Sequence, residues 1–266
     1  MSESSHSNSS STPPPRTNAV MAVALAVSIG ALCLSVVALL VASGIIEGSP
    51  ATVDFDKQVR AYLLANPETI LDAVKRLEAR QQDSEKSELT ATIASASDEI
   101  FNDPASPVGG NPEGDVSLVE FFDYNCSYCR KATPILTELE AGDPGLRIVF
   151  KEFPILGPGS EFAARAALAS RKQNKYLAFH KAMMGHTGSI DENSVFEIAA
   201  GQGLDIELLK KDMEDPLIGQ AIANNLALAA KLRITGTPGF IAGKEIVRGL
   251  APLRSMKELI ARARQQ

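Results

Sequence analysis

Cysteine and histidine are scarce in this sequence, which has three of each among 266 residues. So few cysteines exclude a scaffold held together by many disulfides. A basic surplus is also missing: 26 Lys and Arg stand against 32 Asp and Glu, for a net charge of -6. We therefore expect no nucleic-acid partner, because such proteins carry a basic surface. The length allows one sizeable domain with accessory segments.

Charged residues are absent from Ala19–Ile46, which follows a Ser- and Pro-rich tail over residues 1–18. The tail has too little apolar surface to fold and is predicted to be disordered. A helix needs about 20 apolar residues to cross a bilayer, whereas a cleaved signal has a core of about 7 to 15. We predict a retained transmembrane anchor at residues 19–46; a long signal peptide cut near "VASG" is the alternative.

The charges that flank this segment indicate its orientation. Arg16 precedes it, and Glu47 and Asp54 follow it. The positive-inside rule then places the tail in the cytoplasm and the rest of the chain in the periplasm. We expect a single-pass protein of the inner membrane whose main domain lies in an oxidising compartment, where disulfides persist.

Residues 47–107 are predicted to form a helical stalk and a linker. Apolar residues recur at helical spacing within residues 54–101, at Phe55, Val59, Leu63, Ile70, Val74 and Leu77. Such a stripe has little to pack against within one chain, so it favours a homo-oligomer; a solvated spacer helix is the alternative. Residues 101–115 are rich in Pro, Gly, Asn and Asp, which places the boundary of the main domain near residue 108.

Two of the three cysteines, Cys126 and Cys129, are separated by two residues and lie just after "VSLVEFF", a β-branched and aromatic segment typical of a buried strand. The residues after them predict a helix. Cys126 would then lie at a helix N-terminus, which favours a thiolate, and Cys129 would follow one turn later on the same face. This arrangement is suited to thiol–disulfide exchange. A structural zinc would need four ligands, and a structural disulfide this short would constrain the chain little.

The rest of the chain predicts an α/β fold. A second strand is expected at residues 146–155, a helical block at about 158–230, two strands in "GFIA" and "EIVRG", and a last helix in "PLRSMKELIARARQ". This order of elements is that of a thioredoxin-like fold with an inserted helical domain. The domain is expected to cover residues 108–266, preceded by the stalk and one transmembrane helix.

The motifs also resemble a known family. Cys-x-x-Cys after a strand, followed late in the chain by "GTPGF", is similar to the thioredoxin superfamily, and "VEFFDYNCSYC" resembles its DsbA-type thiol–disulfide oxidoreductases. The stalk segment "QVRAYLLANPETIL" resembles the ScsC-like (copper-sensitivity suppressor C) branch. The resemblance covers about residues 54–266, whereas the predicted anchor departs from the soluble periplasmic form.

This resemblance implies roles for individual residues. Cys126 would attack and Cys129 would be its partner, while Thr237 and Pro238 would form the Thr–cis-Pro loop that faces them. Glu120 would be the buried acid of the family.

Three further residues take roles from the same resemblance. Lys151 would be the charge partner of Glu120, on the adjacent strand, in a pair that either shuttles protons for Cys129 or is only an ion pair. Ser127 and Tyr128, between the cysteines, would contact substrate and tune the redox potential.

We therefore expect a membrane-anchored periplasmic protein disulfide oxidoreductase that needs no cofactor beyond its redox-active cysteine pair and no metal. Its partners would be cysteine-containing substrate proteins and a membrane redox partner that resets the pair. Two alternatives stay open. One is an oligomeric disulfide isomerase. The other is a binding module, either a holdase or a copper-handling protein that uses His180, Met183, Met184 and His186.

Overall fold

The computed structural model of the chain describes residues 31–32, 34–40, 42–43 and 51–266. The predicted tail at residues 1–18 lies outside the described residues, as does most of the predicted anchor at residues 19–46. Among the residues described, no helix is both long and apolar enough to span a bilayer. The chain divides into two compact units, Met1–Arg76 and Leu77–Gln266.

The first unit contains α2 (Ala51–Ala65) and the start of α3 (Glu68–Ser95). The predicted stalk is therefore helical, with a break at residues 66–67. Apolar side chains on these helices stay exposed, including Phe55 at 63% and Leu64 at 74%. They line an open groove of about 490 Å³ together with Val59, Leu63 and Ile70.

The second unit is built on a five-stranded sheet in the order β1-β3-β2-β4-β5. Its strands are β1 (Val108–Gly110), β2 (Val116–Phe122), β3 (Leu146–Glu152), β4 (Gly239–Ala242) and β5 (Glu245–Arg248). Strands β2 and β3 are parallel and are connected through α4 (Ser127–Gly142), whereas the other neighbours pair antiparallel. The fold is the thioredoxin-like α/β arrangement that the order of predicted strands and helices indicates.

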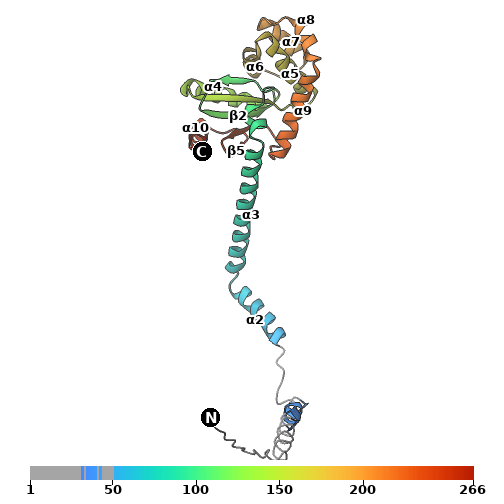
Figure 1. Cartoon of the computed structure of the whole chain (residues 1–266), viewed down its shortest axis with the longest axis vertical. Helices are drawn as coiled ribbons and strands as arrows, with labels where there is room; N and C mark the ends of the chain where they lie inside the picture. The colour runs from blue at the N-terminus through green and yellow to red at the C-terminus, as the bar shows by residue number, and fades with distance from the viewer. Residues whose placement is uncertain (1–30, 33, 41, 44–50) are drawn as a thin grey trace, which may run out of the picture. The chain divides into compact units, whose positions relative to one another are not determined.

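Helices fill the long connection between β3 and β4 and also end the chain (Figure 1). They are α5 (Pro158–Ala169), a short 3₁₀ helix (Ser170–Gln173), α6 (Tyr176–Gly185), α7 (Glu192–Gly201), α8 (Ile206–Met213), α9 (Pro216–Lys231) and, after β5, α10 (Leu253–Ala263). Small residues on α5, such as Ala163, Ala166 and Ala167, are fully buried, so neighbouring helices pack closely around it. We call the segment from α5 to α9 the insertion.

Alternate residues of the central strands supply two apolar cores, because successive side chains of a strand point to opposite faces of the sheet. One core contains Leu118 and Phe122 together with side chains of α4, α10 and the insertion. The other contains Val119 and Phe121 together with the end of α3 and the end of α9.

The end of α3 belongs to the second unit. Ile93 and Ile100 are almost fully buried in the core beneath Val119 and Phe121, and a π-helical turn, Asp98–Asn102, continues the packing. The predicted domain boundary near residue 108 therefore differs from the observed division after Arg76. The sequence reading missed this because the Pro- and Gly-rich segment 101–115 does not end the domain; it contains the edge strand β1.

Candidate active site

The two cysteines lie where the sequence places them, at the N-terminus of a helix that follows a buried strand. Cys126 is the N-cap of α4, and its Sγ accepts a hydrogen bond from the backbone N–H of Cys129 at 3.4 Å. Both are free thiols. Their exposure differs: Cys126 keeps 6% of its surface, whereas Cys129 keeps none. Cys126 is thus the sulfur that a partner can reach.

A loop distant in sequence faces the Cys126 sulfur. The Thr237–Pro238 peptide bond is cis. The Cys126 thiol lies 3.3 Å from the carbonyl oxygen of Thr237, to which it donates across 111 residues of sequence. The Pro238 carbonyl accepts a hydrogen bond from the Gly249 N–H at 2.7 Å, and this carbonyl therefore already has a partner within the protein. The structure therefore brings both predicted loop residues to the cysteine pair.

Glu120 is a buried acid on the central strand β2, with 2% of its surface exposed. Burial raises the pKa of its carboxyl to about 8, because removal from water disfavours the charged form. Burial, and then the charge of Glu120, raise the pKa of the Cys129 thiol as well. Glu120 is therefore close enough to influence the buried cysteine, as the family resemblance implies.

Lys151 is not the charge partner of Glu120, and that prediction is wrong. In the parallel pairing of β2 with β3, Lys151 lies opposite Phe121, whereas Glu120 lies opposite Phe150. Side chains alternate along a strand, so Lys151 and Glu120 point to opposite faces of the sheet.

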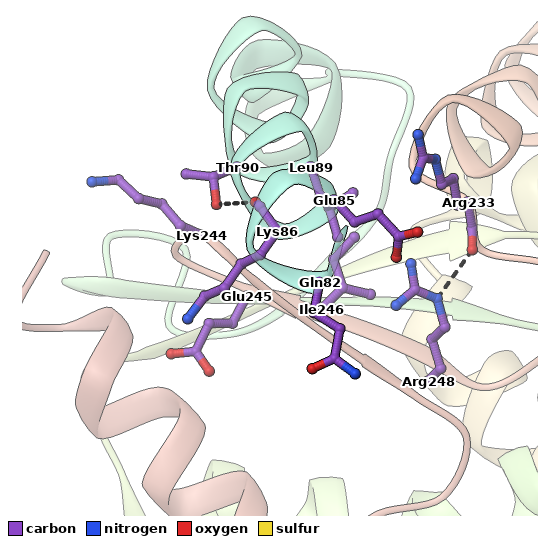
Figure 2. Close-up of a pocket in the computed structure, with 10 residues that line it drawn as sticks. All are labelled: Gln82, Glu85, Lys86, Leu89, Thr90, Arg233, Lys244, Glu245, Ile246 and Arg248. Carbon is purple, nitrogen blue, oxygen red and sulfur yellow. Dashed lines mark hydrogen bonds between the residues drawn. The ribbon is translucent and has the colours of Figure 1, made fainter. Parts of the chain in front are cut away.

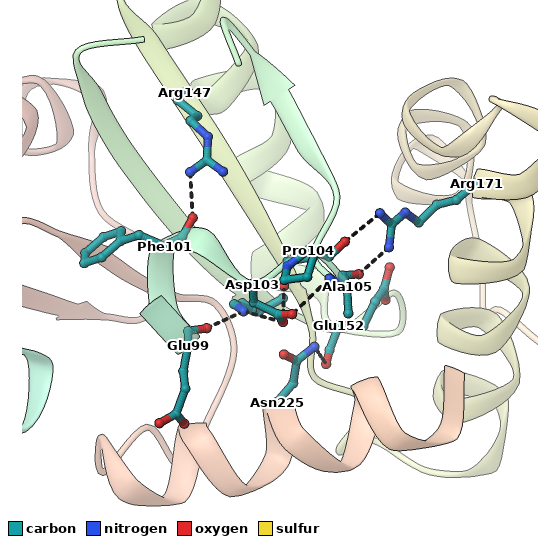
Figure 3. Close-up of polar contacts among 11 residues, drawn as sticks. Glu99, Phe101, Asp103, Pro104, Ala105, Arg147, Glu152, Arg171 and Asn225 are labelled. Atoms are coloured by element: carbon teal, nitrogen blue, oxygen red, sulfur yellow. Dashed lines mark hydrogen bonds and ion pairs between the residues drawn. The ribbon is translucent and has the colours of Figure 1, made fainter. Parts of the chain in front are cut away.

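Lys151 instead holds the segment that follows α3 against the sheet. Its Nζ donates to the Glu99 carbonyl at 2.7 Å and to Asp103 Oδ2 at 3.0 Å; both residues are labelled in Figure 3. Burial lowers the pKa of the Lys151 ammonium, and the Asp103 carboxylate opposes that shift. Lys151 therefore has a structural role in this fold: it holds Glu99 and Asp103 against the sheet.

Ser127 and Tyr128, between the cysteines, are exposed on the first turn of α4. Tyr128 keeps 56% of its surface, and the Lys131 ammonium lies 5.4 Å from the centre of its ring. Both predicted contact residues are thus open to a partner beside Cys126.

Residues just before the cysteines organise the site, and the sequence analysis missed them. The buried Asp123 carboxylate accepts from the backbone N–H groups of Asn125, Ile155 and Leu156 and from the Ser160 hydroxyl, at 2.7–2.9 Å. It therefore joins the segment before Cys126 to the loop after β3 and to α5. The signal was three consecutive polar residues, "DYN", next to Cys126.

A second buried network surrounds Glu152 at the end of β3. Its Oε1 accepts from the Tyr124 hydroxyl at 3.1 Å and from the Tyr176 hydroxyl at 2.8 Å, while Nδ1 of His180 lies 3.1 Å from the Tyr124 hydroxyl. Burial raises the pKa of Glu152 and lowers that of the His180 imidazole to about 3. The two consecutive charges of "KE" in an apolar strand were the signal for this network.

This network bears on the copper-handling alternative. His180 packs among the rings of Phe122, Phe150 and Tyr176, and Met183 and Met184 are buried in the core. Within the part of the chain that the structure describes, no group of three or more His, Cys, Asp or Glu is placed to hold a metal ion. His180, Met183 and Met184 are thus part of the buried interior of the domain.

A separate cavity of about 500 Å³ lies between α3 and β5 (Figure 2). Both of its arginines make hydrogen bonds within the protein: Arg248 Nε donates to the Arg233 carbonyl at 3.0 Å, and Arg233 pairs with Glu88 at 3.1 Å. None of the residues that line it belongs to the cysteine site.

Comparisons with known proteins agree with this geometry. The DSBA-like thioredoxin domain family matches residues 117–261, and the copper resistance protein ScsC N-terminal domain matches residues 52–83. A thioredoxin-like oxidoreductase from Silicibacter pomeroyi DSS-3 is 51% identical, with a TM-score of 0.63 over 64% of this chain and 98% of that chain.

Two other solved structures are similar to this chain. The thiol-disulfide exchange protein alpha-DsbA2 from Wolbachia pipientis is 28% identical, with a TM-score of 0.63 over 67% of this chain and 97% of that chain. ScsC of Proteus mirabilis, in a transitional conformation, is 26% identical, with a TM-score of 0.61 over 84% of this chain and 99% of that chain.

This chain matches only about a fifth of the length of a curated relative. The Na(+)/H(+) antiporter NhaA 3 of Salinispora tropica is 27% identical over 135 residues, which are 50% of this chain and 21% of the antiporter. The likeness therefore concerns one part of that protein. The DSBA-like match, in contrast, covers more than half of this chain, from the strand before the cysteine pair to the last helix. The chain thus belongs to the DSBA-like thioredoxin domain family.

Proposed function

We propose that the protein is a membrane-anchored periplasmic thiol–disulfide oxidoreductase that exchanges disulfides with substrate proteins through Cys126 and Cys129. One observation carries the proposal: the reachable Cys126 sulfur caps α4 and accepts the Cys129 N–H, while Cys129 is buried behind it. A helix N-terminus favours a thiolate at that position, and only the thiolate attacks a disulfide. The pair therefore has one attacking sulfur and one resolving sulfur.

The exchange follows from which sulfur is reachable. In oxidation, a substrate thiolate attacks Cys126 Sγ of the Cys126–Cys129 disulfide; a mixed disulfide forms and Cys129 leaves as a thiolate that takes up a proton. A second substrate thiolate then attacks the substrate sulfur of the mixed disulfide and releases the Cys126 thiolate. Two substrate thiols become one disulfide, and the protein gains the two electrons. The sulfurs carry the electrons, so the reaction needs no additional cofactor or metal.

Glu120 is the proposed proton donor and acceptor for Cys129. Its carboxyl has a pKa of about 8 and is therefore mostly protonated at neutral pH. It can give a proton to the leaving Cys129 thiolate and take one back in the reverse direction. Lys151 takes no part, because it lies on the other face of the sheet.

Exposed apolar side chains on the stalk favour self-association and, with it, the isomerase alternative. Phe55 is 63% exposed and Leu71 is 61% exposed, on helices that bury almost nothing within their own unit. Burying such side chains against another copy of the chain is favourable by about 25 cal/mol per Å² of apolar surface. An oligomer would present several cysteine pairs to one misfolded substrate, which suits the reshuffling of wrong disulfides.

Location and partners are proposed from the sequence. The uncharged segment Ala19–Ile46 is long enough to hold the protein in the inner membrane, with residues 47–266 in the periplasm. In that compartment a membrane redox partner would reset the cysteine pair after each cycle, and the substrates would be cysteine-containing secreted proteins.

Two substrates test the proposal and its direction. Reduced ribonuclease measures oxidation, and scrambled ribonuclease measures isomerisation. We expect the wild-type protein to restore ribonuclease activity in at least one assay and Cys126→Ser to abolish it. Cys129→Ser should accumulate a covalent complex that reductant dissolves.

The matched control is Cys33→Ser, which removes the cysteine outside the pair and should leave both assays unchanged. Equal ribonuclease recovery with wild-type protein and with Cys126→Ser would disprove the proposed function.

A further inference from the structure

A loop of the insertion makes hydrogen bonds to the residues on both sides of the cysteine pair. This loop, residues 186–190, connects α6 to α7 and is called here the clamp loop. Before the pair, Asn125 Oδ1 accepts from the Ile190 N–H at 2.7 Å, and Asn125 Nδ2 donates to the Ile190 carbonyl at 3.0 Å. After the pair, Arg130 Nη1 donates to the Gly188 carbonyl at 2.6 Å. The Cys126–Cys129 segment is thus held between two attachments to one loop.

The Asn125 carboxamide is matched to the backbone it contacts. It offers one acceptor and one donor, and Ile190 supplies the complementary donor and acceptor, as in a pair of β-strand residues. Asn125 Nδ2 also lies 3.2 Å from Ser160 Oγ, which itself donates to Asp123.

Gly159 shows independently that this close approach is built into the fold. A Cβ at residue 159 would lie 2.5 Å from the Ile190 carbonyl oxygen and 3.5 Å from Asn125 Nδ2. Gly159 is near the start of α5, where its backbone has no positive φ that would require glycine. The glycine therefore makes room for the Ile190 carbonyl that Asn125 holds.

We infer that Asn125 is a positioning residue for Cys126, acting through the clamp loop. It directly precedes Cys126, and its own N–H is held by Asp123 Oδ1 at 2.8 Å. Fixing residue 125 keeps the Cys126 sulfur at its 3.4 Å contact with the Cys129 N–H. This contact stabilises a thiolate more than a disulfide sulfur, so Asn125 favours the reduced form of the pair. The inference rests on the proposed exchange at Cys126.

The test is the equilibrium with glutathione, in which the protein disulfide and two glutathione thiols give the protein dithiol and glutathione disulfide. Asn125→Ala removes no contact with the sulfur itself; it frees residue 125 and so weakens the hydrogen bond from the Cys129 N–H to Cys126 Sγ. That bond is made to a charged group when Cys126 is a thiolate, and its loss changes an equilibrium about tenfold. We expect Asn125→Ala to lower the equilibrium constant for reduction about tenfold, which corresponds to a potential about 30 mV more negative.

Asn111→Ala is the matched control. Asn111 also makes one donor and one acceptor bond to backbone, with the Pro144 carbonyl at 2.9 Å and the Glu113 N–H at 3.0 Å. It lies near the start of β3, at the end of the sheet away from the cysteines. This variant should keep the wild-type potential, whereas a purely structural effect on the domain would move both variants alike.

Gly159→Ala tests the same contact without removing Asn125. The added methyl group should push the Ile190 carbonyl away and lower the equilibrium constant to a similar extent, and the double variant should be no worse than either single variant, because both remove one interaction. Should Asn125→Ala fail to fold, Gly159→Ala decides alone. Wild-type potentials in both variants would overturn the inference, whereas a wild-type protein that does not exchange with glutathione would overturn the proposed function.

Discussion

The buried carboxyl of Glu120 makes a measurable prediction about stability and pH. Its pKa is raised from 4.5 to about 8 in the folded protein because burial disfavours the charge. Between these two values the unfolded chain has released the proton while the folded protein still holds it. Stability therefore falls as pH rises through this range, since the folded state binds more protons.

The size of the effect follows from the shift. Each pKa unit corresponds to about 1.4 kcal/mol, so a rise from 4.5 to about 8 lowers the free energy of unfolding by about 5 kcal/mol across the window. Glu120→Gln keeps the shape of the side chain and removes the titration. Relative to this variant, the wild-type protein should lose stability steadily from about pH 5 to pH 8.

Urea unfolding of the two reduced proteins at pH 5, 6.5 and 8 measures this difference. Glu152 is also a buried acid with a raised pKa, and it is present in both proteins; burial is the main cause of its shift and the charge of Glu120 the smallest, so most of the Glu152 contribution is common to both. Glu192→Gln, on the exposed first turn of α7, controls for replacing a carboxylate by an amide. A stability difference between wild type and Glu120→Gln that stays constant from pH 5 to 8 would refute the reasoning.

Three further predictions concern other parts of the chain. Lys151→Met should lower the free energy of unfolding by about 3 kcal/mol, because Asp103 loses its buried partner. The equilibrium of the cysteine pair with glutathione should stay unchanged in this variant. A shift of that equilibrium would contradict the placement of Lys151 on the opposite face of the sheet from Glu120. Iodoacetamide should modify Cys126 before Cys129, whose thiol is fully buried and has a raised pKa; peptide mass mapping that finds equal labelling would argue against this. Light scattering should give an oligomeric mass for a fragment of residues 48–266 and a monomeric mass for residues 77–266, and two monomers would leave the stalk as a spacer only.

Local chemistry along the chain was enough to predict much of the site. Apolar β-branched segments predicted β2 and β3, and the position of Cys126 between a strand and a helical segment predicted that it caps a helix; the structure confirms both. These features depend on residues that are neighbours in sequence, so a short window contains all the information they need. The resemblance to the family added Thr237 and Pro238, which lie too far from Cys126 in sequence for spacing to connect them.

Tertiary structure alone decided which side chains meet. Glu120 and Lys151 lie on adjacent strands, but a one-residue difference in register puts them on opposite faces of the sheet, and no local pattern reports that register. The contact of Asn125 with Ile190 spans 65 residues and depends on how the insertion folds back over the cysteine pair. A sequence determines which groups are available near Cys126 along the chain, whereas packing between distant segments determines which of them hold its sulfur in place.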